Sequence, residues 1–372
     1  MPRDINQRLS ALRSRRSGTD RMSAVAMDAR QEILAKSIVT ESYQEKAKSK
    51  SFTEYALGAM QEVDAAYTSI SLDTADRVGK QLKLCLGNAG ISVGFELQGS
   101  VPLNIHIRGV SDVDLLTLSG DFLMYDPGGS GAYSSAPTSR TSISVLSAIR
   151  TEAEKGLRLK YPSATVDSTG SKSVKISGGT LLRPVDVVPS HWYDTAAYQR
   201  SNQKHDRGVT ILDKKKAATI DNYPFKHMAL VAERDNKAIG SLRKAIRLCK
   251  NVSNDGESSI RLTSFDIASL MYHADVSTLS LGCIYEFAIL AETQRFLDWL
   301  YHNQASAKML RVPDGSRCIL DSENKITALL HLSNEMDDLL KQVAKEQTPL
   351  WGLRDSYSLA QSREALRALK LE

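Results

Sequence analysis

One stretch of the sequence, residues 97–118, constrains the fold more than any other. It reads LQGSVPLNIHIRGVSDVDLLTL and ends in an apolar run that carries two carboxylates, Asp112 and Asp114. Residues two apart in a strand point to the same side, about 6–7 Å from each other. We therefore expect both carboxylates to project together from one face, while Val113 and Leu115 point the other way into a core.

This pair of carboxylates allows two interpretations, a metal site and a solvent-facing edge strand. Adjacent carboxylates repel each other and cost stability unless a cation neutralises them. Ligand sets made only of oxygen suit a hard ion such as Mg²⁺. Paired aspartates also occur on exposed strands, so the spacing alone does not separate the two interpretations.

A Gly-Ser pair before the carboxylates favours the metal site. Gly99 lets a phosphate approach the backbone, and Ser100 offers that phosphate a hydroxyl and an N–H. A third carboxylate, Asp186, lies downstream in LLRPVDVVPS, an otherwise apolar strand where an unpaired charge is costly. Three carboxylates beside a Gly-Ser turn are the set that two-metal phosphoryl or nucleotidyl transfer requires.

The motifs GS, DVD and VDVVPS resemble those of the polymerase-β-type nucleotidyltransferase superfamily. Within it the chain is most similar to the cGAS/DncV-like nucleotidyltransferases (CD-NTases), which are cyclic oligonucleotide synthases. Eleven residues separate Ser100 from Asp112, a longer gap than in the minimal toxin-type enzymes. The resemblance implies an α+β fold: a polymerase-β-like core with a mixed sheet and flanking helices, followed by a C-terminal helical lobe.

The resemblance also implies an activity. It predicts a metal-dependent nucleotidyltransferase that joins nucleoside triphosphates, ATP among them, into a cyclic di- or trinucleotide second messenger and releases pyrophosphate. Two Mg²⁺ ions, replaceable by Mn²⁺, would be held by Asp112, Asp114 and Asp186. In a bacterial member, the product would serve antiphage signalling through a separate effector. A regulatory protein is a further expected partner, and nucleic acid is not required.

Three residues in the second half of the chain are further candidates for nucleotide binding. Lys250 ends the segment SLRKAIRLCK, and Ser264-Phe265 opens LTSFDIASLM, with Ser264 as the expected N-cap. In animal relatives, a lysine and a serine at similar places hold the donor triphosphate, and an aromatic residue beside the serine stacks on a base. With Gly99 and Ser100 they complete the expected nucleotide site. The alternatives are a solvent-exposed lysine, an ordinary cap and a core ring.

Composition limits the choices without deciding among them. With 42% hydrophobic and 24% charged residues, the 372-residue chain is an ordinary globular protein with room for two or three domains. The sequence has no apolar run near the ~20 residues that span a membrane and no signal peptide, so we expect a cytoplasmic protein. The four cysteines lack CxxC spacing, which argues against a structural zinc.

Apolar periodicity predicts the organisation of the chain. We expect a helical N-terminal segment over 1–60, the catalytic domain over 61–220 and a helical lobe, similar to that of oligoadenylate synthases, over 221–372. Within the catalytic domain, we expect a helix over 73–87 that begins at Asp73 or Thr74. We also expect the strand of Asp186 to end at Pro189, and 213–224 to form a surface turn.

Two alternative functions remain at this point. A nucleotidyltransferase that acts on RNA or protein, by terminal nucleotide addition or AMP transfer, would use the same three aspartates. An RNA enzyme predicts a broad basic groove, whereas this chain has only short Lys/Arg clusters and a net charge of +5. A catalytically silent nucleotide-binding scaffold is disfavoured because three clustered carboxylates are costly without a metal to bind.

Overall fold

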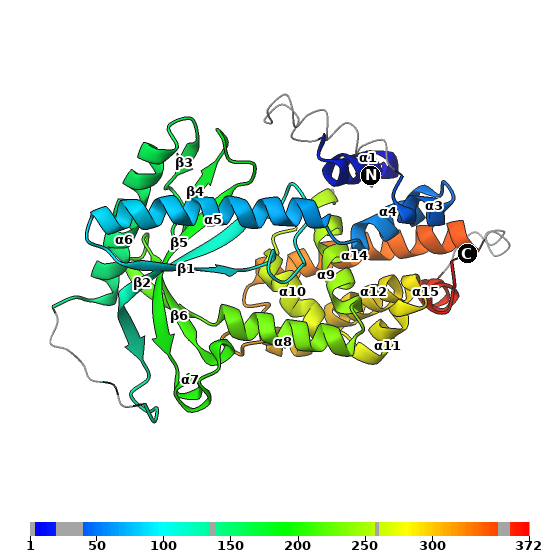
Figure 1. Cartoon of the computed structure of the whole chain (residues 1–372). Helices are drawn as coiled ribbons and strands as arrows, with labels where there is room; N and C mark the ends of the chain where they lie inside the picture. Colours follow the sequence, from blue (N-terminus) through cyan, green and yellow to red (C-terminus); the bar gives the residue numbers. More distant parts are fainter. Residues whose placement is uncertain are drawn as a thin grey trace. The chain divides into compact units, whose positions relative to one another are not determined.

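The structure is a computed structural model. It describes residues 4–19, 40–131, 133, 139–256, 260–348 and 358–371. The chain divides into two compact units, an α/β unit and a helical unit (Figure 1). The α/β unit comprises Asp64–Leu103 and Ser111–Ala229, and the helical unit comprises Met1–Val63, Asn104–Val110 and Leu230–Glu372. The N-terminal helices, which we expected as a segment of their own, therefore belong to the helical unit.

A mixed sheet forms the frame of the α/β unit. In the described residues it has seven strands in the order β1-β2-β5-β4-β3, with β6 paired to β5 and β7 paired to β6. Strands β2 and β5 are parallel, and the other pairs are antiparallel. The strands are β1 (Val93–Gln98), β2 (Val113–Tyr125), β3 (Thr165–Asp167), β4 (Val174–Ser177), β5 (Val185–Asp194), β6 (Gly208–Asp213) and β7 (Ala218–Asn222).

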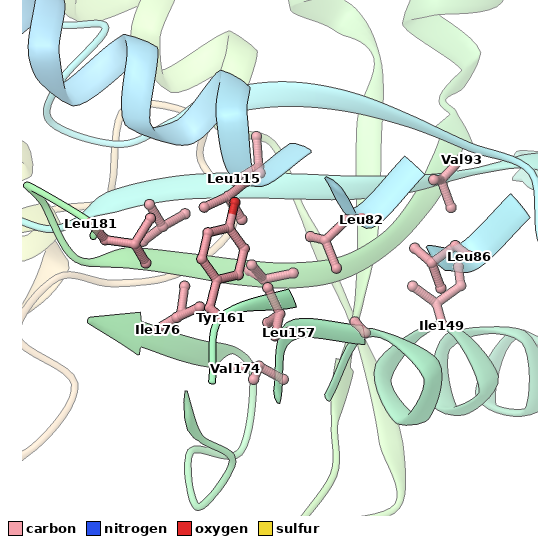
Figure 2. Packing of buried hydrophobic residues seen from close by; sticks show 14 of the residues in the cluster. Leu82, Leu86, Val93, Leu115, Ile149, Leu157, Tyr161, Val174, Ile176 and Leu181 are labelled. Carbon is pink, nitrogen blue, oxygen red and sulfur yellow. The ribbon is translucent and has the colours of Figure 1, made fainter. Parts of the chain in front are cut away.

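Two helices, α5 (Ala65–Asn88) and α6 (Ser142–Lys160), pack on one face of this sheet (Figures 1 and 2). Their fully buried side chains, such as Leu86 and Ile149, belong to the same buried cluster as Leu115 and Val187, which are opposite each other on β2 and β5. Full burial of one such side chain contributes about 1.5–3 kcal/mol. Because side chains alternate along a strand, this packing turns the residues next to Leu115 and Val187 toward the opposite face.

Helix α5 begins earlier than the sequence indicated. Its N-cap is Asp64, whose carboxylate accepts hydrogen bonds from the backbone N–H groups of Ala66 and Tyr67. Thr74, one of the two predicted starts, lies inside the helix and donates its hydroxyl to the Ile70 carbonyl. The expectation of a start at Asp73 or Thr74 was wrong because a better capping residue stands one turn or more upstream.

Strand β5 continues through Pro189, where we expected it to end. Pro189 is opposite Thr117 of β2 on one side. On the other side, pairing with β4 stops at Val187 and pairing with β6 starts at Ser190. Proline cannot donate to a strand ladder, and it is tolerated here because no second strand pairs with it at that position.

The segment expected as a surface turn around the lysines is mostly a hairpin. Strands β6 and β7 pair in an antiparallel ladder, and only 214–217 form the turn between them. Val209 and Ile211 are buried with Leu116 and Phe225 on the face of the sheet opposite α5 and α6. The missed signal is the alternation of apolar residues in GVTILD.

The helical unit contains the N-terminal helices and most of the helical lobe predicted over 221–372. Its N-terminal helices are α1 (Ile5–Ser17), α3 (Ser42–Ala47) and α4 (Ser51–Met60). The later helices are α8 (Pro224–Lys237, which starts in the α/β unit), α9 (Ser241–Asp255), α10 (Ser264–Tyr272), α11 (Val276–Ser280), α12 (Glu286–His302), α13 (Gln304–Met309), α14 (Glu323–Gln347) and α15 (Leu359–Arg367). No helix within the described ranges has the length and apolar character needed to cross a membrane.

A buried ion pair joins helix α1 to helix α9. The Arg15 guanidinium donates to both carboxylate oxygens of Asp255, at 2.7 Å each. The Tyr55 hydroxyl of α4 donates to the same carboxylate at 2.9 Å. Both charged side chains are at most 10% exposed, so each depends on the other for its neutralisation.

We predict that Arg15→Met lowers the free energy of unfolding by about 3 kcal/mol, because it leaves the Asp255 charge buried without its cation. The measurement is urea unfolding followed by circular dichroism. Lys46→Met is the matched control, since the Lys46–Glu286 pair is solvent-exposed and such pairs contribute ~0–1 kcal/mol. Equal losses in the two variants would contradict the prediction.

Candidate active site

Four polar residues form one row across neighbouring strands of the α/β unit. Gln98 of β1 is opposite Asp114 of β2, Asp114 is opposite Asp186 of β5, and Asp186 is opposite Lys175 of β4. Residues opposite each other in a sheet share a face. The row therefore projects two of the three predicted carboxylates side by side, away from the core under α5 and α6.

Asp112 joins this row through Lys175. It lies immediately before the first residue of β2, so it is not in the strand as we expected. Its Oδ2 forms an ion pair with the Lys175 ammonium. Lys175 thus forms an ion pair with Asp112 and lies opposite Asp186 in the pairing of β4 with β5. The structure brings the three predicted aspartates to one face and adds a lysine that the motifs did not indicate.

The carboxyl group of Asp186 is the most confined of the three. Its Oδ1 accepts a hydrogen bond from the Ser173 hydroxyl at 3.2 Å. Burial raises the pKa of Asp186 above its usual value, and the nearby charge of Asp112 raises it further, while Lys175 and Ser173 act in the opposite direction. A carboxylate in this setting gains from any additional cation that reaches it.

The glycine of the Gly-Ser turn is required by both its conformation and its surroundings. Gly99 has a φ of +84°, in the left-handed region that favours glycine. A β-carbon at this position would overlap the Oδ2 atom of Asp114. The turn therefore brings backbone against the carboxylate, and the half-buried Ser100 follows directly after it.

Three candidate residues lie in the helical unit, where the structure excludes one alternative for Lys250 and corrects the expected N-cap. Lys250 is buried and donates to the Ile105 carbonyl at 2.7 Å, so it is not a solvent-exposed lysine. The N-cap of α10 is Thr263 and not Ser264, because Thr263 forms a capping box with Asp266. Ser264 is the first residue of the helix.

Phe265, the predicted stacking residue, has one ring face near a cation. The guanidinium carbon of Arg317 lies 5.3 Å from the ring centroid, within the range of a cation–π contact. The side chain is 36% exposed, so Phe265 is not a core ring. Its role in binding a base stays a prediction.

The segment between the Gly-Ser turn and the aspartates is held by helix α9. Arg247 donates to the carbonyls of Asn104, at 2.6 Å, and Met60, at 2.9 Å, while Lys250 binds Ile105. Burial lowers the pKa of Arg247 to about 10. The hydrogen bonds to carbonyls offset the free-energy cost of burying this charged side chain. Motif reasoning did not find Arg247, since contacts to backbone carbonyls have no sequence pattern.

Ser173 and Lys175 could have been found from the sequence. Val174 and Ile176 are buried in the core under α5 and α6, so their neighbours Ser173 and Lys175 must face the other side, toward Asp186. The alternation of polar and apolar residues in SVKIS carries this information. The pairing register that puts Lys175 opposite Asp186 becomes visible only in the structure.

The carboxylates fit a hard divalent cation in their chemistry. The three aspartates offer only oxygen donors, which Mg²⁺ and Mn²⁺ prefer, and the Lys175 ammonium already occupies a cation position beside Asp112. Across the described ranges, no group of three or more His, Cys, Asp or Glu side chains is close enough together to hold a metal. Binding of metal by all three aspartates therefore requires their side chains to move closer.

A cavity of about 710 Å³ lies in the α/β unit along edge strand β1. Its lining includes Leu97 and Pro102, which flank the Gly-Ser turn in the sequence, together with Phe95, Lys204 and Phe225. A volume of this size with mainly apolar walls and a few polar groups is typical of small-ligand sites. The site thus combines a carboxylate row, a phosphate-accessible turn and an adjacent cavity.

The chain is similar to proteins of known activity. A cyclic dinucleotide synthase CdnE from Yersinia aleksiciae is 44% identical over 313 residues, which cover 83% of this chain and 81% of that protein. The chain belongs to the CdnE enzymes of the CD-NTase family. A c-di-GMP synthase from a Lachnospiraceae bacterium is 30% identical, with 76% of this chain and 86% of that protein covered. No family model matches the chain.

The fold of the family extends over most of the chain. The solved structure of a STING-associated CdnE c-di-GMP synthase from Capnocytophaga granulosa superposes with a TM-score of 0.70 at 23% identity, covering 91% of this chain and 97% of that one. The predicted α+β fold, with a nucleotidyltransferase core and a helical lobe, is confirmed. The prediction of a cyclic oligonucleotide synthase is confirmed at the level of the family, whose members are metal-dependent nucleotidyltransferases.

Substituting the turn glycine tests the close approach of Asp114. Gly99→Ala is expected to lower kcat at least ~100-fold, because a displacement of the carboxylate by about 1 Å has an effect of that size. Release of pyrophosphate provides the measurement. Gly94→Ala, in strand β1 just before the turn and with open space around its β-carbon, should retain activity within about twofold of wild type. Similar losses in both variants would show that β1 is merely sensitive to substitution.

The raised pKa of Asp186 predicts a pH-dependent gain in stability. The ionised carboxylate of Asp186 destabilises the folded protein. This destabilisation is absent at pH values below the usual pKa of 3.8 and complete at pH values above the raised pKa of the folded state. Asp186→Asn should therefore raise Tm by about 1–3 °C at pH 8 in EDTA, and by less at pH 5, while abolishing activity. Asp121→Asn is the control because Arg140 lowers the pKa of Asp121, so it should not be stabilising. A loss of Tm in Asp186→Asn would contradict this.

Proposed function

We propose that this enzyme joins two nucleoside triphosphates into a cyclic dinucleotide and releases two pyrophosphates. The observation that carries the proposal is the placement of Asp114 directly opposite Asp186, with Gly99 against the Asp114 carboxylate. A carboxylate row beside a backbone that a phosphate can approach serves nucleotidyl transfer. The ring size is supported by the names of the relatives, which are a cyclic dinucleotide synthase and c-di-GMP synthases.

We assign the metal site to Asp112, Asp114 and Asp186, which would hold two Mg²⁺ ions or Mn²⁺ in their place. When bound, the metal supplies positive charge to the triphosphate and lowers the pKa of the acceptor hydroxyl. The acceptor ribose oxygen then forms a bond to the α-phosphorus while the bond from that phosphorus to pyrophosphate breaks. Ser173 holds Asp186 through Oδ1, so Oδ2 is the atom that would take the hydroxyl proton.

The protein groups around the phosphates have separate roles in this proposal. The backbone at Gly99 and the hydroxyl of Ser100 bind phosphate oxygens without adding charge, which lets the leaving pyrophosphate be stabilised by fixed dipoles. From the helical unit, Lys250 and Ser264 would hold the donor triphosphate, and Phe265 would stack on its base. For Lys250 this requires a change from its present bond to the Ile105 carbonyl.

The biological role follows from the family. We propose that the cyclic product is a second messenger in antiphage defence and that a separate effector protein recognises it. The C. granulosa and Flavobacteriaceae structures are described as STING-associated c-di-GMP synthases, so an effector of that kind and guanine as a substrate base are the first to test. A regulatory protein is a further proposed partner.

The assay for this function uses purified enzyme, Mg²⁺ or Mn²⁺ and the four ribonucleoside triphosphates, followed by phosphatase treatment and mass spectrometry. We expect a phosphatase-resistant species with the mass of a cyclic dinucleotide, whose bases the mass identifies. The Asp112→Ala/Asp114→Ala variant should form none, because removal of two of the three carboxylates leaves the metal without its ligands. Asp121→Asn, at the far end of the same strand, should match wild type.

Other outcomes separate the alternatives. A linear or RNA-attached product after addition of an RNA acceptor would favour the terminal transferase, and labelled AMP on a protein would favour AMP transfer. A cyclic trinucleotide would retain the synthase and correct the ring size. Equal product from wild type and the double aspartate variant would overturn the assignment of the site.

A further inference from the structure

We propose that Lys175 is the internal counter-cation of the aspartate cluster and competes with the metal ion for it. This inference rests on the proposed function in one respect, the assignment of Asp112, Asp114 and Asp186 as the metal-binding residues. It assigns to Lys175 a positioning role in the metal-free enzyme. It also predicts how tightly the free enzyme binds a divalent cation.

The strand register fixes where the Lys175 side chain originates. Lys175 is opposite Asp186 in the antiparallel pair of β4 and β5, and its neighbours Val174 and Ile176 are fully buried on the other face. Because side chains alternate along a strand, the Lys175 side chain lies on the face opposite to that of Val174 and Ile176. It must project from the face that carries Asp186, and there its ammonium reaches Asp112.

The negative charges of the three aspartates need a compensating cation. Asp112, Asp114 and Asp186 together carry three negative charges when ionised, in a region where burial already disfavours the charge on Asp186. A single lysine between Asp112 and Asp186 reduces the repulsion of both carboxylates. Without it, the metal-free enzyme would have the cost of three adjacent carboxylates with no compensating partner from β4.

The Lys175 ammonium lies where a divalent cation would bind Asp112, and its positive charge repels such a cation. Lys175 is on a flexible four-carbon stem, and its side chain is 41% exposed, so it can leave Asp112 without disturbing the core. A metal ion must displace it or bind near its positive charge. The free enzyme should therefore bind metal weakly. A triphosphate brings its own negative charge, so metal and nucleotide should bind together more tightly than metal alone.

This arrangement differs from a merely structural ion pair in one measurable way. A structural pair contributes to folding, and its loss would lower stability without strengthening metal binding. A competing counter-cation opposes metal binding, so its removal should raise the affinity of the nucleotide-free enzyme for metal. Binding of Mn²⁺ in the absence of triphosphate reports this directly, by electron paramagnetic resonance of the free ion or by calorimetry.

The deciding variant is Lys175→Met, which keeps the length and apolar stem of the side chain and removes its charge. We expect Mn²⁺ to bind the nucleotide-free variant at least about tenfold more tightly than wild type, since a like charge near the ion is removed. Lys172→Met is the matched control because Lys172 is an exposed lysine of the same hairpin, and it should leave Mn²⁺ affinity unchanged. Lys175→Arg retains the charge and should stay close to wild type.

The outcomes separate this inference from the function on which it rests. Unchanged or weaker Mn²⁺ binding in a folded Lys175→Met protein would overturn the inference. If triphosphate affinity falls at the same time, Lys175 is a substrate contact and not a counter-cation. If wild type makes the cyclic product, the proposed function stands whatever Lys175 does. If Asp112→Ala/Asp114→Ala binds Mn²⁺ as well as wild type, the metal site itself is misassigned.

Discussion

The parallel pairing of β2 with β5 is the interaction on which the site depends. Its register places Leu115 opposite Val187 and Asp114 opposite Asp186 in successive positions. The apolar pair is locked into the core under α5 and α6 (Figure 2). A shift of either strand by one residue would turn its carboxylate toward the core and its apolar residue away from it. The energy of the core therefore holds the carboxylates in place, although none of them contributes to that core.

The features that were predicted correctly from the sequence arise from a regular alternation of residues or from a steric restriction. The alternation around Asp114 and Asp186 predicts which face each residue uses, and the Gly-Ser turn predicts backbone exposed to a phosphate. Gly99 shows why that turn could be recognised, because its positive φ and the overlap of a β-carbon with Asp114 leave no other residue type. The resemblance to a family added the overall architecture, a mixed sheet with flanking helices and a helical lobe, which periodicity does not contain.

The elements that were missed depend on choices between near-equivalent neighbours or on distant contacts. Asp64 caps helix α5 although Asp73 and Thr74 are acceptable caps, and Thr263 displaces Ser264 because only Thr263 has an acid at the capping-box spacing. Lys175 required the register of β4 against β5. Arg247 binds main-chain carbonyls far away in the sequence, and no local pattern announces such a contact.

The short segment Asn104–Val110 limits how this fold can be divided. It lies between Ser100 and Asp112 in the sequence, yet it belongs to the helical unit, where Ile105 and Ile107 are buried and α9 binds its carbonyls. A fragment that keeps only the α/β unit would have to carry this segment with two isoleucines stripped of their cover, between the two motifs that build the site. The α/β unit is therefore not expected to fold on its own. Gene fusion or domain exchange would have to transfer both units together.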